Sequence, residues 1–169
     1  EVLVRVAYCG ICPSDVRVYA GRKVYGYPTV LGHEFSGWVD EVGPGVTSLK
    51  AGDPVVVDPM LRCVSECAAC RRGVSNKCMN LPHGTGGNEG LAQYAIAPAN
   101  HVYRLKESTD LVAACFGEPL ACVLHGQHRA KIRAGSTVCI VGSGPIGLLH
   151  LMCAKAAGAR VIVSEPTPA

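Results

Sequence analysis

The sequence predicts an α/β protein whose N-terminal part is mainly β. Short runs of alternating apolar and polar residues, separated by turns rich in Gly and Pro, dominate the first two thirds of its 169 residues. From about Leu111 the pattern changes to a helical segment rich in Ala and Leu. An apolar strand, a helix and a second apolar strand follow, which together form one β-α-β unit. The length corresponds to one domain or slightly more.

Five short strands are expected in the N-terminal part. Apolar residues alternate at period two between Val2 and Tyr8, and strand-like runs bounded by Gly and Pro occupy residues 36–43 and 53–59. Residues 91–105 hold another pair of strands, separated by a turn at Pro98-Ala99-Asn100. Strands of this length and spacing indicate a small barrel or sandwich.

The helical segment covers residues 111–131 and should break near Glu118-Pro119, since proline disrupts a helix interior. Apolar strands are then expected at residues 136–142 and 160–165, with a helix over residues 144–159 between them. As parallel strands of an α/β unit, these two strands should be buried on both faces.

A polar turn separates these two regions, so we place the domain boundary between residues 131 and 132. The predicted domains are residues 1–131 and residues 132–169. Glu1 enters a strand pattern directly, and Ala169 closes a Pro-rich turn immediately after a strand. We therefore expect the chain to be a fragment of a longer protein.

Composition excludes several classes of function. The net charge of +3 is spread along the chain without a dense Lys/Arg run, which argues against nucleic-acid binding and against a polybasic membrane anchor. The sequence contains no apolar run of membrane-spanning length and no signal peptide pattern. Ten cysteines fit metal binding in a reducing cytoplasm better than a disulfide framework, so we predict a cytoplasmic protein.

Four cysteines lie in one short polar stretch with the spacing C-x3-C-x2-C-x7-C: Cys63, Cys67, Cys70 and Cys78. Such a cluster predicts a tetrahedral zinc site. A disulfide pair would need an oxidising compartment, and four unligated thiols would be prone to oxidation. The first gap is one residue longer than in a repeated CxxC, so Cys63 is the least certain ligand.

A second motif, G-x-G-x-x-G, covers residues 142–147, where it follows an apolar strand and opens a helix. In this context it predicts a dinucleotide site, with the pyrophosphate at the helix N-terminus. An acidic residue lies 23 positions after Gly142, at the end of the next strand, and predicts NAD over NADP. The alternative is a ligand-free turn with an ordinary surface glutamate. The candidate cofactor-binding residues are Gly142, Gly144, Pro145, Ile146, Gly147 and Glu165.

Metal-ligating residue types also occur at strand ends and in loops elsewhere: Cys12, His33, Glu34 and Glu118. Three protein ligands with an open fourth position are how catalytic zinc is held. Taken singly, each residue has an ordinary alternative. The cysteine could be a small buried hydrophobe, the histidine a core residue and either glutamate a surface carboxylate.

These motifs carry a resemblance. The segments CGICPSD, GHEFSGWVDEVGPGV, AGDPVVVDP, the cysteine stretch, GLAQYAIAP, EPLACVLHG and VGSGPIGLLHL occur in the order seen in zinc-dependent medium-chain dehydrogenases. They look most like the branch with sorbitol (L-iditol) and threonine dehydrogenases. The resemblance implies a GroES-like catalytic domain followed by a Rossmann domain. It also implies NAD, two zinc ions per full-length chain, a small alcohol or polyol substrate, and a homo-oligomer when full length.

Matched residue by residue, Cys12 and His33 correspond to ligands of the catalytic zinc, and Glu34 to the adjacent ligand or ligand-exchange residue. Glu118 falls where alcohol dehydrogenases have a second Cys ligand. A glutamate at this position is similar to the polyol branch. Ser14 matches the hydroxyl that takes the substrate proton. Three cysteines of the cluster match structural-zinc ligands, and the first is one residue out of register.

Two departures from the family pattern stand beside these matches. Arg17 replaces the histidine that usually ends the proton relay, and arginine does not titrate near neutral pH. Pro13 replaces the more usual glycine. Cys9 and Cys122 are alternative thiolates, which we interpret as packing residues.

The resemblance implies zinc-dependent, NAD-linked oxidation of a secondary alcohol or polyol to a ketone by hydride transfer. This fragment alone should be inactive, because it holds one β-α-β unit where a dinucleotide domain uses two such halves. The alternatives are a zinc-independent quinone reductase of the same superfamily and a non-catalytic zinc-binding module. The motifs CxSD and GHE argue against the reductase.

Overall fold

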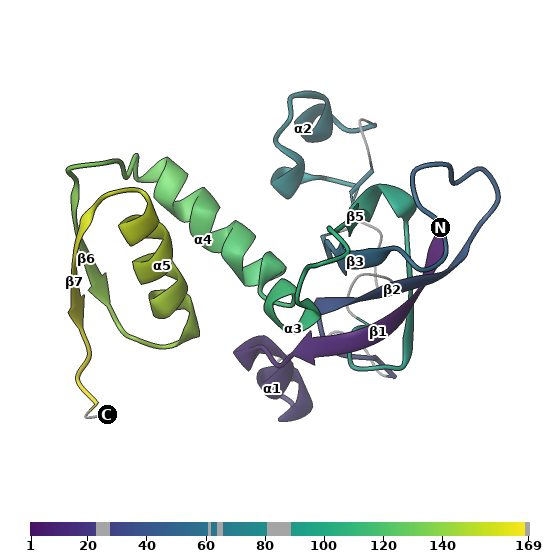
Figure 1. Cartoon of the computed structure of the whole chain (residues 1–169), viewed down its shortest axis with the longest axis horizontal. Coiled ribbons are helices and arrows are strands. Elements are labelled where there is room, and N and C mark those ends of the chain that lie inside the picture. The colour runs from purple at the N-terminus through teal and green to yellow at the C-terminus, as the bar shows by residue number, and fades with distance from the viewer. Residues whose placement is uncertain (23–27, 61, 64–65, 81–88, 168–169) are drawn as a thin grey trace. The chain divides into compact units, whose positions relative to one another are not determined.

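The computed structural model divides the chain into two compact units, Glu1–Glu118 and Pro119–Ala169. The predicted boundary between residues 131 and 132 stays a prediction. The last two residues of the predicted Pro-rich turn lie outside the described part of the chain. The residues described are 1–22, 28–60, 62–63, 66–80 and 89–167 (Figure 1).

The first unit is built on an antiparallel sheet in which the five expected strands are confirmed. Their order across the sheet is β4-β1-β2-β3-β5, and β1 and β2 are its long central strands (Figure 1). The strands are β1 (Val2–Gly10), β2 (Glu34–Val42), β3 (Pro54–Val57), β4 (Tyr94–Ala97) and β5 (Val102–Arg104).

The core of this unit follows directly from the period-two pattern. Successive strand residues point to opposite faces, so every second side chain of a strand reaches the same side. Val4 and Val55 are fully buried, and Phe35 is nearly so. Together they anchor one apolar cluster that lies on one face of the sheet. Its members are Val2, Val4, Phe35, Val39, Leu49, Val55, Val57, Ala95, Ala97 and Val102.

Short helices connect these strands, and the first of them was not expected. Helix α1 (Pro13–Tyr19) follows β1, with Cys12 as its N-cap residue and Pro13 at its first position. Seven residues are too few to show an apolar periodicity, so the sequence pattern does not reveal this helix. Proline suits a first helical position because its backbone needs no donor there, which gives the departure at Pro13 a structural role.

The remaining short helices of the first unit lie in its connecting segments. They are α2 (Ala68–Arg71) and the 3-10 turn η1 (Ser75–Lys77) in the cysteine stretch, η2 (Ala99–His101) at the expected turn before β5, and α3 (Leu111–Ala114).

The helical segment breaks earlier than predicted. Helix α3 ends at Ala114 and α4 (Gly117–Arg129) starts three residues later, so the break lies at Cys115-Phe116 rather than at Glu118-Pro119. Pro119 falls in the first turn of α4, where a helix tolerates proline because the N–H groups there have no intrahelical acceptor. The predicted position is therefore wrong, and the proline helps to start a helix instead of interrupting one.

The second unit confirms the predicted β-α-β order. It contains β6 (Thr137–Val141), α5 (Pro145–Ala156) and β7 (Arg160–Ser164), and the two strands pair in parallel. Figure 1 shows α5 lying against this two-stranded sheet. None of the described helices has the length and apolar character that a membrane span requires.

The expected burial of these strands on both faces is wrong for the described chain. Val141 is 84% exposed and Ile162 is 48% exposed, whereas Ile140 and Ala154 are buried. The reason is the size of the sheet within this unit. One helix can cover only one face of two strands, so residues on the other face remain accessible.

Candidate metal and nucleotide sites

Cys12, His33 and Glu34 come together at one end of the β1–β2 pair. One ligand atom from each lies within 4.8 Å of those of the other two, and all three residues are half-buried. Antiparallel pairing explains the meeting, because Gly10 at the end of β1 is paired with Glu34 at the start of β2. Thiolate, imidazole and carboxylate are the ligand types of catalytic zinc, so this donor set fits such an ion.

Asp15, a residue that the sequence interpretation missed, ties this group together. Its carboxylate is buried, and Oδ2 accepts a hydrogen bond from the Cys12 N–H at 3.0 Å. Oδ1 accepts from the Gly32 N–H at 3.2 Å and lies 3.4 Å from Nδ1 of His33. A carboxylate facing one ring nitrogen of a histidine is the usual arrangement when the other ring nitrogen binds a metal.

The signal for Asp15 was present in the segment CGICPSD. An acidic residue three positions after a helix N-cap returns its side chain to the N-cap N–H, as in a capping box. Because the seven-residue helix α1 was not expected, this spacing carried no meaning at the sequence level.

Gly32 positions the neighbouring histidine through its backbone. Its φ of +92° lies in the left-handed region, and a Cβ there would be 2.6 Å from the backbone nitrogen of Leu91. The N–H of Leu91 donates to the Leu31 carbonyl at 2.9 Å, so the two segments run close together. Only glycine fits this approach without strain.

The two relay positions both lie on α1. Ser14 is half-buried in the first turn, two residues after Cys12 and directly before Asp15. Arg17 lies three residues further along the helix and is exposed. Residues three apart on a helix share a face, so the guanidinium is on the side of the helix that carries Ser14.

Other residues considered as ligands lie outside the three-residue group. Glu118 is half-buried in the first turn of α4, and its role as a ligand stays a prediction. Cys9 is half-buried, and burial raises the pKa of its thiol to about 11. Its thiolate therefore forms less readily than that of an ordinary cysteine. Cys122 is exposed on α4.

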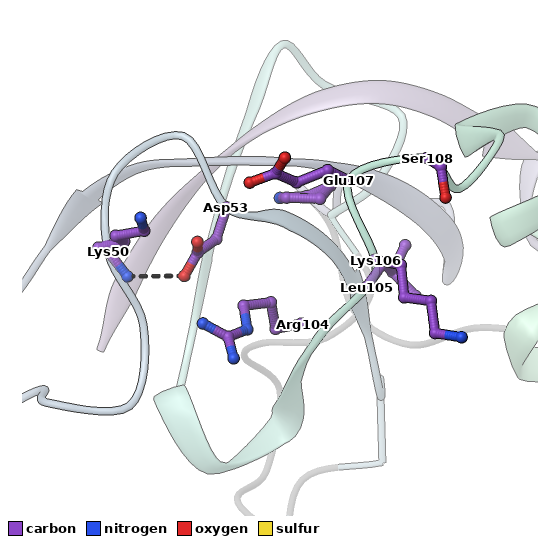
Figure 2. A pocket seen from close by; sticks show the side chains of 8 residues that line it. Lys50, Asp53, Arg104, Leu105, Lys106, Glu107 and Ser108 are labelled. Carbon is purple, nitrogen blue, oxygen red and sulfur yellow. Dashed lines mark hydrogen bonds between the residues drawn. The ribbon is translucent and has the colours of Figure 1, made fainter.

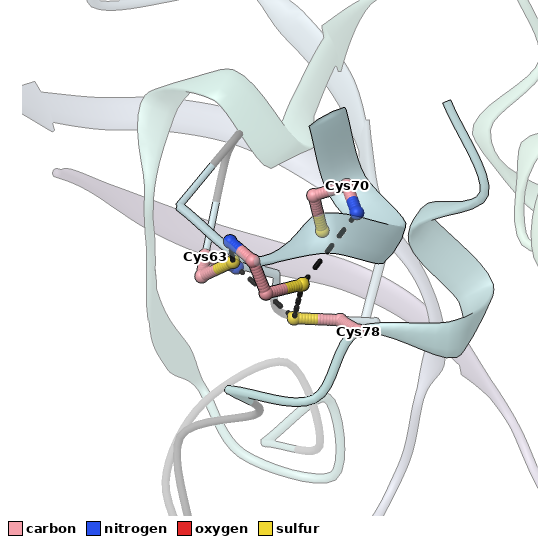
Figure 3. Close-up of side chains that lie close together, drawn as sticks. Cys63, Cys70 and Cys78 are labelled. Atoms are coloured by element: carbon pink, nitrogen blue, oxygen red, sulfur yellow. Dashed lines mark hydrogen bonds between the residues drawn. The ribbon is translucent and has the colours of Figure 1, made fainter. Parts of the chain in front are cut away.

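The four cysteines of the cluster also converge, and Figure 3 labels Cys63, Cys70 and Cys78 of this group. One sulfur from each lies within 4.8 Å of the other three, and Cys63 is included despite its longer gap. The Sγ atoms of Cys67 and Cys78 are 4.0 Å apart. Four thiolates around one zinc stand about 3.8 Å apart, given a Zn–S distance of about 2.3 Å. The arrangement therefore fits a tetrahedral zinc ion.

Backbone donors prepare these sulfurs to carry negative charge. The Cys70 N–H donates to the sulfur of Cys67 at 3.5 Å, and this bond, followed by one from Met79, lowers the pKa of Cys67 to about 6. A similar bond from the Cys63 N–H at 3.5 Å lowers the pKa of Cys78. Thiolate is the form that binds metal.

A surface pocket of about 730 Å³ lies elsewhere on the first unit (Figure 2). Lysine and arginine side chains share it with acidic ones, and Asp53 accepts a hydrogen bond from the Lys50 N–H at 2.9 Å. Its Pro54 is paired with Trp38, four residues along β2 from Glu34, which corresponds to about 13 Å. The pocket is therefore separate from the three-residue ligand group.

The G-x-G-x-x-G segment adopts the conformation that its spacing predicts. Gly144 is the N-cap of α5, and the space around its Cβ position is open. A Cβ on Gly147 would collide with the Gly142 carbonyl, which reflects the close packing of helix and strand. This open, glycine-lined helix start fits a pyrophosphate. Glu165 follows β7 and accepts a hydrogen bond from the Ser143 N–H at 2.8 Å.

A family model described as the alcohol dehydrogenase GroES-like domain matches residues 1–107. The chain belongs to this family. The matched region contains Cys12, His33 and Glu34 as well as the four-cysteine cluster.

Known proteins of this family resemble the chain over nearly its whole length. A sorbitol dehydrogenase of Bombyx mori is 40% identical over 96% of this chain, which spans 48% of that protein. A D-xylulose reductase A of Aspergillus niger is 39% identical over 97% of the chain and 47% of its own length. A zinc-binding dehydrogenase of Sinorhizobium meliloti 1021, solved with NADP bound, is 39% identical, with a TM-score of 0.90 over 98% of this chain and 49% of that one.

These comparisons confirm the predicted fold class. The GroES-like domain accounts for the mainly-β part. The structural similarity to the zinc-binding dehydrogenase of Sinorhizobium meliloti covers 98% of the chain and so includes the β-α-β unit. The chain spans about half the length of the curated relatives it matches.

Proposed function

We propose that the chain is part of a zinc-dependent, NAD-linked dehydrogenase that oxidises a secondary alcohol or polyol to a ketone. The observation that carries the proposal is the meeting of Cys12, His33 and Glu34, three unlike ligands within 4.8 Å. The sorbitol and xylulose enzymes among its relatives support a polyol substrate. Since the chain spans about half of those relatives, the activity belongs to the full-length protein.

When bound, zinc supplies a Lewis acid for the substrate hydroxyl and NAD supplies the hydride acceptor. Cys12 and His33 would hold the ion together with a carboxylate, either Glu34, which the resemblance gives as ligand or ligand-exchange residue, or Glu118. Asp15 orients two of these ligands through its contacts with the Cys12 N–H and the His33 ring. The Gly-rich start of α5 would bind the pyrophosphate through its free N–H groups.

Proton removal is assigned to the hydroxyl of Ser14, whose Oγ would accept the alcohol proton. Arg17 on the same helix cannot take that proton onward, because its guanidinium stays charged at neutral pH. The proton then passes from Ser14 Oγ to water or to another group.

The four-cysteine cluster would hold a second zinc with a structural role. A shell closed by four thiolates leaves no open position for substrate. We therefore place the chemistry at the three-residue group and assign the cluster to stabilising its own loop. Cytoplasmic location and homo-oligomerisation stay predictions.

The test uses the full-length protein. Metal analysis should give two zinc ions per chain for the dehydrogenase, one for a non-catalytic module and none for a quinone reductase. A substrate screen with polyols and simple secondary alcohols, run with NAD and with NADP, should show nicotinamide reduction with at least one polyol. Two zinc ions without reduction of either nucleotide would contradict the proposal.

A further inference from the structure

The carboxylate of Glu165 accepts hydrogen bonds from residues of two segments. Oε2 accepts from the Ser143 N–H at 2.8 Å and from the Ser143 hydroxyl at 3.2 Å. Oε1 accepts from the Thr167 N–H at 3.0 Å. The acidic residue after β7 is therefore attached to the Gly-rich segment before α5, although 22 positions separate Ser143 from Glu165 in the sequence.

The parallel pairing of β6 and β7 brings these segments together. Val141 is in register with Ser164, and the Gly142 N–H donates to the Ser164 carbonyl at 2.8 Å. The next residues along the two strands are then Ser143 and Glu165. The N–H of residue 143 would be present with any residue other than proline, but the hydroxyl depends on serine.

The electrostatics agree with this geometry. Hydrogen bonds to the charged form, chiefly from the Ser143 N–H and then from the Thr167 N–H, lower the pKa of Glu165 to about 2. The carboxylate is thus ionised at every pH at which the protein would work. An ionised carboxylate accepts hydrogen bonds at both oxygens and repels a like charge, which are the properties that a ribose-binding acidic residue needs.

We infer that Ser143 is a specificity-determining positioning residue, whose hydroxyl fixes the Glu165 carboxylate for the adenosine ribose of the cofactor. This inference rests on the proposed NAD-linked function. A fixed carboxylate accepts a hydrogen bond from the ribose 2′-hydroxyl of NAD and repels the 2′-phosphate of NADP. Without the hydroxyl, the side chain of Glu165 gains rotational freedom, and both effects weaken.

The experiment measures nucleotide binding directly, by isothermal titration calorimetry of the full-length protein with NAD and separately with NADP. Ser143→Ala should weaken NAD binding about threefold to tenfold, the range for one ordinary hydrogen bond, because the backbone donors of residues 143 and 167 still hold the carboxylate. NADP binding should stay unchanged or tighten. Ser143→Thr keeps the hydroxyl and should restore the original ratio. Ser164→Ala, which removes an exposed neighbouring hydroxyl, is the control and should change neither affinity.

Each result decides one point. An equal loss of NAD and NADP affinity in Ser143→Ala would show a purely structural role and overturn the inference, as would an unchanged ratio. Failure of the threonine variant to restore the ratio would overturn it too. If the unaltered protein binds neither nucleotide, the proposed function itself fails. If the unaltered protein binds NAD and the ratio of NAD to NADP affinity is the same in Ser143→Ala, only the inference fails.

Discussion

Two groups of metal-ligating side chains in this chain are equally compact but are assembled differently. The four cysteines and the group of Cys12, His33 and Glu34 each bring their ligand atoms within 4.8 Å. The cysteines come from one stretch of residues 63–78, and local turns suffice to bring them together. The mixed group comes from residues separated by about twenty positions, joined only where β1 pairs with β2.

The support behind the two groups differs in the same way. Backbone N–H groups from within the cluster itself stabilise its sulfurs, as the bonds from Cys63 and Cys70 show. The mixed group instead depends on one buried carboxylate, Asp15, which contacts both segments. A local cluster of one ligand type favours a closed structural site. A tertiary cluster of unlike ligands favours an open site that can accept substrate.

The largest expected effect is a loss of activity when a ligand of the mixed group is replaced. Cys12→Ser in the full-length protein should lower kcat/KM about 1,000-fold, because weakened Lewis acidity removes several kcal/mol of transition-state stabilisation. Metal analysis should show one zinc ion lost, and steady-state kinetics with the preferred polyol measures the rate. Cys122→Ser, exposed on α4, is the matched control and should leave both values unchanged. Full activity of Cys12→Ser after treatment with a chelator would show that Cys12 has no role in catalysis.

The second prediction reverses that pattern. Cys67→Ser should lose the other zinc ion and lower Tm by about 10 °C, because structural zinc contributes directly to folding. Activity at low temperature should stay within about threefold of the unaltered value, since the cluster holds no substrate position. Calorimetry together with kinetics measures both. A loss of activity as large as in Cys12→Ser, without a change in Tm, would reverse the roles of the two groups.

The third prediction tests the support behind the mixed group. Asp15→Asn should weaken zinc binding at that site about tenfold to a hundredfold, the usual effect of changing a residue behind a metal ligand. An amide cannot accept from both the Cys12 and Gly32 N–H groups while also contacting His33. Competition with a chelator measures the affinity. Asp40→Asn is the control, because Asp40 is partly exposed and only loosely paired with Arg5 at 3.9 Å.

The smallest expected effect concerns Glu165 and its bond to Ser143. The pKa of Glu165 is lowered to about 2. The stability that its hydrogen bonds contribute is therefore complete above the ordinary pKa of a glutamate and is lost as the pH falls toward about 2. The contribution of these hydrogen bonds to stability should therefore be constant between about pH 5 and pH 8. In Ser143→Ala the titration midpoint of this carboxyl should move upward, which NMR of the side-chain carbon measures. An unmoved midpoint would mean that the hydroxyl contributes nothing to the charged form.

Much of this architecture could be predicted from local patterns. Alternation identified the first strand, because burial on one face of a sheet repeats every second residue. Apolar runs bounded by Gly, Pro and turn residues identified the other four. Cysteine spacing predicted the local cluster, and the glycine spacing predicted the glycine-lined start of α5. The helix break was misplaced, since the same proline that interrupts a helix interior is tolerated in a first turn.

The sequence by itself determined features that depend on neighbours along the chain: strands, turns, the four-thiol cluster and the glycine motif. The family resemblance implied that Cys12, His33 and Glu34 share one site, but only the tertiary structure showed that their ligand atoms meet and that buried Asp15 joins them. It also decided that Ser143 holds Glu165. The physical reason is that strand pairing sets which distant residues face each other, and a spacing pattern contains no record of that register.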